Sequence, residues 1–324
     1  MTDALTPWWR GATIYQIYPR SFADSNGDGI GDLAGITAHL PYVASLGVDA
    51  IWLSPFFKSP MRDFGYDVSD YCDVDPIFGT LADFDALIAR AHDLGLRIIV
   101  DQVWAHTSDE HPWFIESRSS RQNDHADWYV WADAKPDGTP PNNWQSVFGG
   151  PAWTWDARRG QYYMHNFLKE QPQINLHNGK VQAAVLDIVR FWLDRGVDGF
   201  RIDAINHSMP DPQLRDNPPA PEDGRIRTRP YDFQIKRYSQ SHPDIPLFLE
   251  KVRSVFDEYP DRFTVAEVGG DDSDAEMKAF TQGDHRLNTA YGFDFLYAPK
   301  LTAQFLKDAL SRWPAEQGIG WPSW

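Results

Sequence analysis

A repeated local order of helix, glycine and strand is the feature that most limits what this chain can fold into. Residues 46–53, 94–101 and 195–203 each place a glycine directly before a compact apolar run of strand length. Each run follows a stretch with helical apolar spacing, and each glycine fits the left-handed position at which helices commonly end. Helices that alternate with buried strands predict an α/β protein whose parallel strands form a sheet or a barrel.

Two of the predicted helices also carry start signals. Thr80 and Asp83 have the spacing of a capping box, and Asn178 is a suitable N-cap. Three further segments, residues 13–18, 263–267 and 292–297, have the pattern of strands and bring the candidates for parallel pairing to six. The apolar stripes of the two helices are Phe84, Leu87, Ile88, Ala91 and Leu94 in one and Val181, Val185, Ile188 and Trp192 in the other.

One segment breaks the alternation. Residues 104–178 are rich in Trp, Pro, Asp and Asn, and they are too many for an ordinary connection between a strand and a helix. We expect an inserted subdomain after the third strand, over the carboxyl ends of the strands, where barrels build their active sites. Its tryptophans either stack on sugar rings or, as is commoner, form the small core that such a subdomain needs.

Charged side chains follow or end the predicted strands. Asp101 and His106 follow the third strand, and Arg201 and Asp203 lie two residues apart in the fourth, so the last two share a face. An arginine beside Asp203 favours its ionised, nucleophilic form. Glu267 ends the fifth strand after apolar residues, which favour a protonated acid. Two such carboxyls predict glycoside hydrolysis through a covalent intermediate. A structural ion pair and a polar belt beneath the insertion remain alternatives.

Four segments then carry a family resemblance. Residues 101–106 (DQVWAH), 171–175 (QPQIN), 199–203 (GFRID) and 265–267 (VAE) resemble consecutive signatures of glycoside hydrolase family 13, the α-amylase superfamily. The QPQIN segment, with residues 21–33 and 65–71, resembles the α-glucosidase and oligo-1,6-glucosidase branch. The resemblance implies a (β/α)8 TIM barrel with residues 104–178 as its inserted subdomain B and residues 1–103 and 179–324 as the N-terminal part of the barrel.

The resemblance also implies the roles of individual residues. Asp203 is the expected nucleophile and Glu267 the expected acid/base of a retaining, exo-acting enzyme that hydrolyses or transfers one terminal α-glucosyl unit of a small oligosaccharide. Ala204, the residue after the nucleophile, resembles members that act on α-1,4 linkages more than those that act on α-1,6 linkages. Arg201 is expected to orient the nucleophile. The expected substrate-binding residues are Tyr66, Asp67, His106 and Arg201.

The chain departs from the family near its end. Members carry a further Asn-His-Asp signature at the seventh strand, an eighth strand and a β-rich C-terminal domain, whereas this sequence ends at Trp324. We therefore expect an incomplete barrel of about six strands, part of a longer enzyme or completed by a second polypeptide, with little activity as an isolated chain. A non-catalytic carbohydrate-binding protein and a sugar isomerase of the same superfamily are the alternatives.

An acidic loop near the N-terminus suggests a metal. Its oxygen-bearing residues have the spacing of the first ligands in a calcium-binding loop. Gly35, however, stands where an EF-hand would have its closing glutamate. An ordinary turn is the alternative. The resemblance favours a structural Ca²⁺ or Mg²⁺ without a catalytic role, and no organic cofactor. The candidate ligands are Asp24, Asn26, Asp28, Ile30 through its carbonyl, and Asp32.

Composition restricts the partners. The net charge of -16 argues against nucleic acid and anionic membranes, because both would repel the chain. Cys72 is the only cysteine, so no intrachain disulfide can form. The first residues lack the layout of a signal peptide, and no apolar run reaches the length of a membrane span, so the expectation is a soluble cytoplasmic protein.

Overall fold

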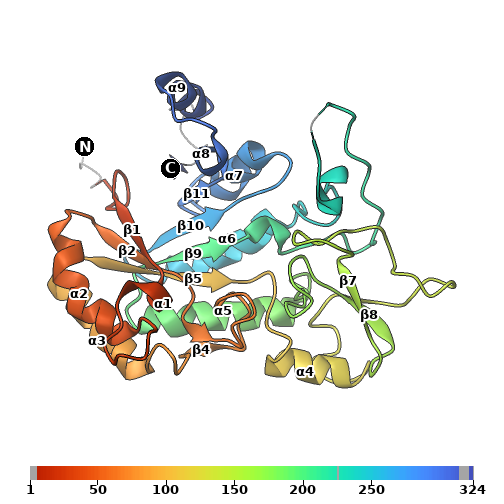
Figure 1. The fold of residues 1–324 in the computed structure, drawn as a ribbon, viewed down its shortest axis with the longest axis horizontal. Coiled ribbons are helices and arrows are strands. Elements are labelled where there is room, and N and C mark those ends of the chain that lie inside the picture. The colour runs from red at the N-terminus through yellow and green to blue at the C-terminus, as the bar shows by residue number, and fades with distance from the viewer. Residues whose placement is uncertain (1–5, 225, 314–320, 324) are drawn as a thin grey trace. The chain divides into compact units, whose positions relative to one another are not determined.

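The computed structural model describes residues 6–224, 226–313 and 321–323, and their main element is a parallel sheet (Figure 1). Within these residues the sheet has seven strands in the order β1-β2-β5-β9-β10-β11-β12. Between the strands lie helices, as the sequence predicts. The strands are β1 (Ile14–Ile17), β2 (Ala50–Leu53), β5 (Arg97–Val103), β9 (Gly199–Asp203), β10 (Phe263–Glu267), β11 (Thr289–Tyr291) and β12 (Trp321–Pro322).

Five of the six predicted strands are confirmed, and the sixth is displaced. Residues 292–297 are not a strand, because β11 ends at Tyr291 and the helix α8 (Asp294–Tyr297) begins soon afterwards. Thr289 and Ala290 are buried and pair with β10, whereas Asp294 lies in the first turn of α8, where an acid suits the helix dipole. The described residues also contain the short β12, so the sheet has one strand more than predicted.

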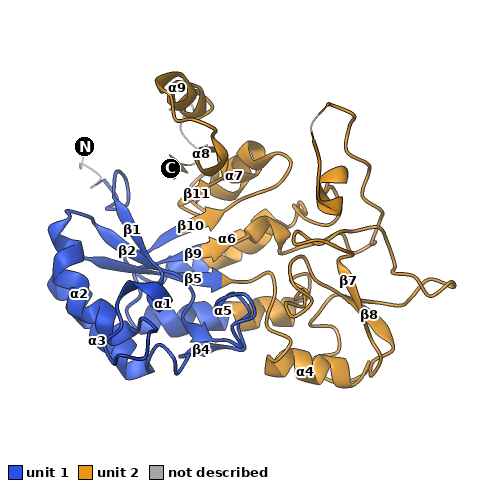
Figure 2. Cartoon of the chain, viewed as in Figure 1, with its two compact units in different colours: residues 1–102, 186–201, 254–264 blue, residues 103–185, 202–253, 265–324 orange. Residues whose placement is uncertain are grey.

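The chain divides into two compact units (Figure 2). The first unit comprises residues 1–102, 186–201 and 254–264, and the second comprises residues 103–185, 202–253 and 265–324. The second unit therefore joins residues 104–178 to later parts of the chain, and the proposed division into subdomain B and barrel stays a prediction.

The first unit is built from regular strand and helix repeats. Its elements besides strands of the main sheet are α1 (Pro19–Phe22), α2 (Leu33–Ser45), the antiparallel pair β3 (Phe57–Lys58) and β4 (Asp70–Val74), α3 (Leu81–Asp93) and the last turns of α5 (Gly179–Asp194). The capping box of Thr80 and Asp83 is present at the start of α3. Gly95 and Gly196 have φ values of +74° and +93°, as their positions after helices predict.

An aromatic cluster forms part of the core of the first unit. The indole ring of Trp192 stacks on Phe57 with ring centroids 4.9 Å apart and meets Phe84 edge-on at 5.0 Å. Its Nε1 donates to the carbonyl oxygen of Tyr71 at 2.8 Å, so burial of the indole leaves its polar atom satisfied. Trp192, the last residue of the predicted stripe on α5, therefore belongs to this core.

The second unit contains a small antiparallel sheet in addition to the ends of the main strands. Its strands, β6 (Trp131–Ala132), β7 (Trp153–Asp156) and β8 (Gln161–Met164), pair in the order β6-β8-β7. Trp144 and Trp153 are buried with Met164 in a hydrophobic cluster beside them, so these two tryptophans serve as core. Its helices are α4 (Pro112–Ser119), the first turns of α5, η1 (Ile205–His207), η2 (Pro230–Phe233), most of α6 (Ile245–Phe256), α7 (Ser273–Thr281), α8 and α9 (Ala303–Ser311).

No helix within the described part of the chain is long and apolar enough to cross a membrane.

Candidate active site

Two carboxyl-bearing residues of the second unit end neighbouring strands of the sheet. Asp203 is the last residue of β9 and Glu267 the last residue of β10. The backbone N–H of Ala204 donates to Oε2 of Glu267 at 3.1 Å, which brings this carboxyl to the residue that follows Asp203. Asp203 is buried, whereas Glu267 is half-buried. A buried carboxylate and a more accessible carboxyl therefore lie at the ends of adjacent strands.

Local backbone features fix this arrangement. Gly199 opens β9 where a Cβ would lie 2.5 Å from the carbonyl oxygen of Phe263, so only glycine allows β9 to approach β10 there. Ala204 turns the chain sharply after Asp203, with φ +40° and ψ +43°, a left-handed conformation that costs a residue with a side chain about 1–2 kcal/mol. Backbone strain of this kind often accompanies functional sites.

His106, also in the second unit, is buried against the QPQIN segment. Gln171 accepts the backbone N–H of Leu168 through Oε1 at 3.0 Å, which turns its Nε2 toward Nε2 of His106 at 3.1 Å. An amide nitrogen only donates, so Nε2 of the neutral imidazole accepts and Nδ1 carries the proton. The ring of Phe167 meets the imidazole edge-on at 5.2 Å. The imidazole of His106 is thus held in one orientation and one tautomer.

Arg201 has a partner that the sequence interpretation does not assign to it. In the first unit its Nη1 lies 2.7 Å from Oδ1 of Asp101, and both side chains are buried. The indole of Trp52 and the hydroxyl of Tyr66 donate to Oδ2 of Asp101 at 3.1 and 3.3 Å. Asp101 lies inside β5 and not after it, because that strand continues to Val103. The carboxylate of Asp101 therefore fixes the positions of the Arg201 guanidinium and the Tyr66 hydroxyl.

Asp67 is held by the loop of the first unit that contains it. This fully buried carboxylate accepts hydrogen bonds from the Ser59 hydroxyl at 2.8 Å and from the backbone N–H groups of Arg62 and Asp63 at 2.9 Å each. Met61 and Phe64 in the same loop have left-handed φ values of 60° and 51°. The loop is thus shaped around Asp67, which fixes the orientation of its carboxylate.

Side chains of the acidic loop accept hydrogen bonds from the backbone of the same loop and so fix its shape. Asp24 accepts the backbone N–H groups of Asn26, Gly27 and Gly29 at 2.7–3.0 Å, and these bonds lower the pKa of its carboxyl. Asn26 and Asp28 each accept the N–H two residues further on. The result is a series of Asx turns.

The end of this loop explains the missing closing acid. Oδ1 of Asp32 accepts the N–H of Gly35 at 2.6 Å and so caps α2. A Cβ on Gly35 would lie 2.2 Å from the carbonyl oxygen of Ala23, so no glutamate fits at this position. The remaining candidate ligands offer oxygen atoms alone, which is the kind of ligand that Ca²⁺ and Mg²⁺ prefer, but no three acidic side chains of this described loop bring oxygens within 4.8 Å of one another.

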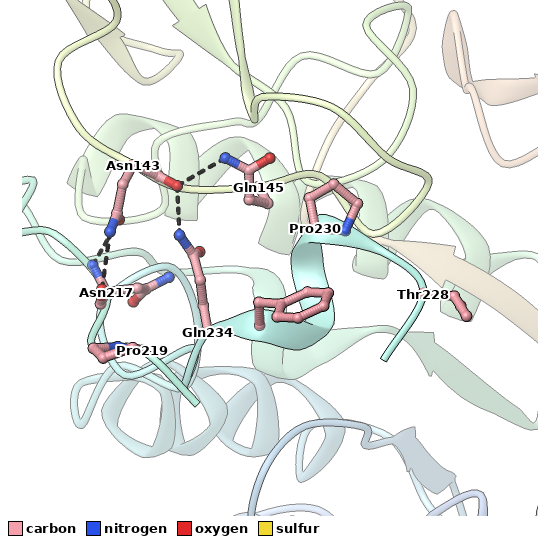
Figure 3. A pocket seen from close by; sticks show the side chains of 8 residues that line it. Asn143, Gln145, Asn217, Pro219, Thr228, Pro230 and Gln234 are labelled. Carbon is pink, nitrogen blue, oxygen red and sulfur yellow. Dashed lines mark hydrogen bonds between the residues drawn. The ribbon is translucent and has the colours of Figure 1, made fainter. Parts of the chain in front are cut away.

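A separate cavity of the second unit, about 560 Å³ in volume, contains none of the predicted site residues (Figure 3). Half of its eight lining residues carry amide side chains, and the Nε2 atoms of Gln145 and Gln234 both donate to the carbonyl oxygen of Asn143, at 3.0 and 2.7 Å. Its lining residues are Asn143, Gln145, Asn217, Pro219, Thr228, Pro230, Phe233 and Gln234.

Each unit therefore gathers some of the predicted residues. Tyr66, Asp67 and Arg201 lie in the first unit, and His106, Asp203 and Glu267 in the second. The sequence gives no role to Gln171 and no structural partner to Asp101, although both lie in the signature segments. The hydrogen bonds that Asp101 accepts come from Trp52 and Tyr66, which are 49 and 35 residues away in sequence.

Comparison with known proteins identifies the family. The model described as "Alpha amylase, catalytic domain" matches residues 16–311. The chain is 58% identical over 323 residues to a "Probable alpha-glucosidase" of Rhizobium meliloti (strain 1021), which covers 98% of this chain and 59% of that protein. It is 43% identical over 337 residues to an "Oligo-1,6-glucosidase" of Heyndrickxia coagulans, covering 98% and 58% respectively.

A solved structure supports the same assignment. The crystal structure of the α-glucosyl transfer enzyme XgtA superimposes with a TM-score of 0.94 at 56% identity and covers 98% of this chain and 60% of that one. The chain thus spans about three fifths of the length of these relatives. The expected fold, an incomplete (β/α)8 barrel, is confirmed. The chain belongs to the α-amylase family, glycoside hydrolase family 13.

Proposed function

We propose that this protein is a retaining, exo-acting α-glucosidase that hydrolyses or transfers a terminal α-glucosyl unit, with a preference for α-1,4 linkages. The observation that carries the proposal is the 3.1 Å hydrogen bond from the N–H of Ala204 to Oε2 of Glu267. It brings the carboxyl of Glu267 to the residue that follows Asp203, which supports a reaction that uses both carboxyls. The names of the relatives, an α-glucosidase, an oligo-1,6-glucosidase and an α-glucosyl transfer enzyme, support this class of activity.

The reaction proceeds in two displacements. In the first, the carboxylate of Asp203 attacks the anomeric carbon while Glu267 donates a proton to the glycosidic oxygen, and the bond to the leaving sugar breaks. In the second, Glu267 removes a proton from water or from an acceptor hydroxyl, which attacks the glucosyl-enzyme and releases Asp203. Each step inverts the anomeric centre, so the product keeps the α configuration.

The remaining residues hold the glucosyl unit and the nucleophile. Arg201 lies two residues before Asp203 in β9, so both side chains leave the strand on the same side. The bond to Asp101 keeps the guanidinium of Arg201 in place. His106 and Asp67 are proposed to bind the glucose hydroxyls, and Tyr66 to stack on the ring. Their hydrogen bonds to the protein support this proposal, because oriented polar groups lose little entropy on binding.

The acidic loop is proposed to hold a structural Ca²⁺ or Mg²⁺. The ion would be bound by oxygens of Asp24, Asn26, Asp28, the Ile30 carbonyl and Asp32, and it would offset the repulsion between the carboxylates. Chelation with EDTA should lower the Tm of the wild-type protein, and CaCl₂ or MgCl₂ added after removal of the EDTA should raise it again in the wild type but not in the Asp24→Ala variant. An unchanged wild-type Tm after chelation would remove the metal from the proposal.

Azide rescue tests the two catalytic roles separately. With p-nitrophenyl α-glucoside as substrate, azide should restore release of nitrophenol in Asp203→Ala and yield β-glucosyl azide, because azide replaces the nucleophile. In Glu267→Ala, azide should attack the glucosyl-enzyme and yield α-glucosyl azide. Glu258→Gln, a surface variant in the first unit, serves as the control with unchanged activity. Rescue with the opposite anomers would assign the two roles the other way round.

The balance between hydrolysis and transfer is measured on the same protein. With maltose as both donor and acceptor, a transferring enzyme forms trisaccharide at the expense of free glucose. The likeness to XgtA leads us to expect transfer as a main product route. A product mixture of glucose alone would restrict the proposal to hydrolysis.

A further inference from the structure

Two histidines and an aspartate of the second unit meet away from the candidate active-site residues. One ligand atom from each of His177, His242 and Asp244 lies within 4.8 Å of the other two. His177 precedes α5, while His242 and Asp244 directly precede α6. No other group of three His, Cys, Asp or Glu ligand atoms comes this close within residues 6–224, 226–313 and 321–323. The sequence interpretation gives these residues no role.

His177 is already oriented as a metal ligand is. Its Nε2 lies 2.8 Å from the carbonyl oxygen of Pro210. A carbonyl oxygen only accepts, so Nε2 carries the proton and Nδ1 of the neutral ring has the lone pair. Metal-binding histidines typically donate their second ring N–H to a carbonyl or carboxylate, which fixes the tautomer and the ring orientation. The bond to Pro210 therefore supplies the outer contact that such a ligand needs.

His242 and Asp244 complete the group. The imidazole of His242 lies 4.8 Å from that of His177, centroid to centroid, and is nearly perpendicular to it at 88°. Its Nδ1 is 3.7 Å from Oδ2 of Asp244, a separation that one ion can bridge with bonds of about 2.0–2.2 Å. Nδ1 also accepts the N–H of Asp244 at 3.2 Å, a long hydrogen bond that a metal–nitrogen bond can replace.

A second acid, Asp211, lies near this group, but it is already part of an ion pair. Asp211 is buried, and its Oδ2 pairs with Nε of Arg215 at 2.7 Å. This pairing offsets the charge of Asp211, and the opposite charges of Asp211 and Arg215 both act on His242. A cavity of about 350 Å³ has His177, Pro210 and Asp211 in its wall, so His177 borders open space. His177 and His242 are half-buried and Asp244 is exposed, so binding requires little desolvation.

We propose that His177, His242 and Asp244 bind a zinc ion whose fourth ligand is water. Two imidazoles and one carboxylate suit Zn²⁺, whereas Ca²⁺ and Mg²⁺ require oxygen ligands, so this site differs in kind from the acidic loop. The ion links the start of α5 to the start of α6, and through the Pro210 carbonyl it also fixes the chain that follows η1. Its role is structural, and it is independent of the proposed glucosidase activity.

Calorimetric titration of tag-free protein with ZnCl₂ tests the site. The protein is first treated with EDTA, which is then removed, and CaCl₂ is present in excess so that oxygen-only sites are filled. We expect one Zn²⁺ per chain in the wild type and binding at least about tenfold weaker in His177→Gln and in His242→Gln. The matched control is His285→Gln, since His285 is an exposed histidine with carboxylates 3.7 and 3.8 Å away. It should bind Zn²⁺ as the wild type does.

Cobalt gives a readout that does not depend on heat or activity. Co²⁺ bound by two imidazoles, a carboxylate and water should give the intense visible absorption of a four-coordinate site, and ZnCl₂ should abolish it. Circular dichroism confirms that each variant is folded. Equal Zn²⁺ affinity in all four proteins, or a loss in His285→Gln alone, would overturn the proposal. So would only the weak absorption of six-coordinate Co²⁺ in the wild type.

Discussion

The acids of the two units differ in how the protein holds them. In the first unit, Asp67 and Asp101 are fully buried and accept hydrogen bonds from an indole, hydroxyls, backbone N–H groups and a guanidinium. In the second unit, Glu267 ends its strand half-buried beside the strained Ala204. The first pair is suited to hold other groups in place, and Glu267 is accessible enough to exchange protons. These hydrogen bonds thus mark Asp67 and Asp101 as positioning acids and exposure marks Glu267 as the acid that exchanges protons, whereas the proposed nucleophile Asp203 is buried like the first pair.

The largest expected effect is on catalysis. Asp203→Asn and Glu267→Gln should lower kcat/KM for maltose at least about 10³-fold, since each removes a group required in the transition state. Their Tm values should stay close to that of the wild type. Steady-state kinetics and thermal unfolding measure both quantities. A large fall in Tm without loss of activity would break the distinction between the two pairs of acids.

Asp101→Asn should have its main effect on stability. It removes the negative charge that pairs with the buried guanidinium of Arg201 at 2.7 Å, and loss of one partner of a buried ion pair costs about 3–5 kcal/mol of the free energy of unfolding. Urea unfolding measures this loss. The control is Asp133→Asn, because Asp133 is an exposed acid in a surface ion pair worth less than about 1 kcal/mol. Equal losses in the two variants would show that burial of the pair does not matter.

Glu276 offers a pH test within the second unit. Burial raises the pKa of its carboxyl to about 7, Asp271 and Asp272 add to this, and the Ser241 hydroxyl opposes it. The folded protein holds this proton more tightly than the unfolded chain, so stability should fall as pH rises from about 4.5 to 7. Glu276→Gln should remove that contribution and raise Tm more at pH 8 than at pH 5. A gain that is equal at both pH values would contradict the raised pKa.

The smallest effect concerns the turn after Asp203. Ala204→Gly relieves the left-handed strain of about 1–2 kcal/mol but adds backbone freedom in the unfolded state worth about 0.5–1 kcal/mol. We therefore expect a net gain in stability of about 0.5–1 kcal/mol. Ala290→Gly in β11 is the matched control, and it should lose stability because its backbone is already extended. A loss in both variants would show that Ala204 is not strained.

The regular part of the fold was predictable from the sequence because local patterns specify it. Thr80 and Asp83 start α3, and Gly95 and Gly196 end helices in the left-handed conformation. The strand expected at residues 292–297 was wrong because its apolar residues do not distinguish a strand from a short helix. Only pairing with β10 selects Thr289–Tyr291 as the strand.

The candidate site was predictable in its residues but not in its contacts. Asp203 and Glu267 could be proposed because each ends a recognisable strand. The partnership of Arg201 with Asp101 joins residues 100 positions apart, and it depends on which strands are neighbours. Position 35 must be glycine because the carbonyl oxygen of Ala23 occupies the space of a Cβ, and this contact is known only from the structure. Long-range contacts of this kind have no local signal in one sequence.

The central claim is that Asp203 forms a covalent bond to glucose, and trapping tests it most directly. The protein is treated with 5-fluoro-α-glucosyl fluoride, which forms the intermediate faster than it is hydrolysed, and its peptic peptides are sequenced by mass spectrometry. The account predicts one fluoroglucosyl group per active chain, attached to Asp203 and absent from Asp203→Asn. A label on another carboxylate, or release of β-glucose from an α-glucoside without any label, would contradict it.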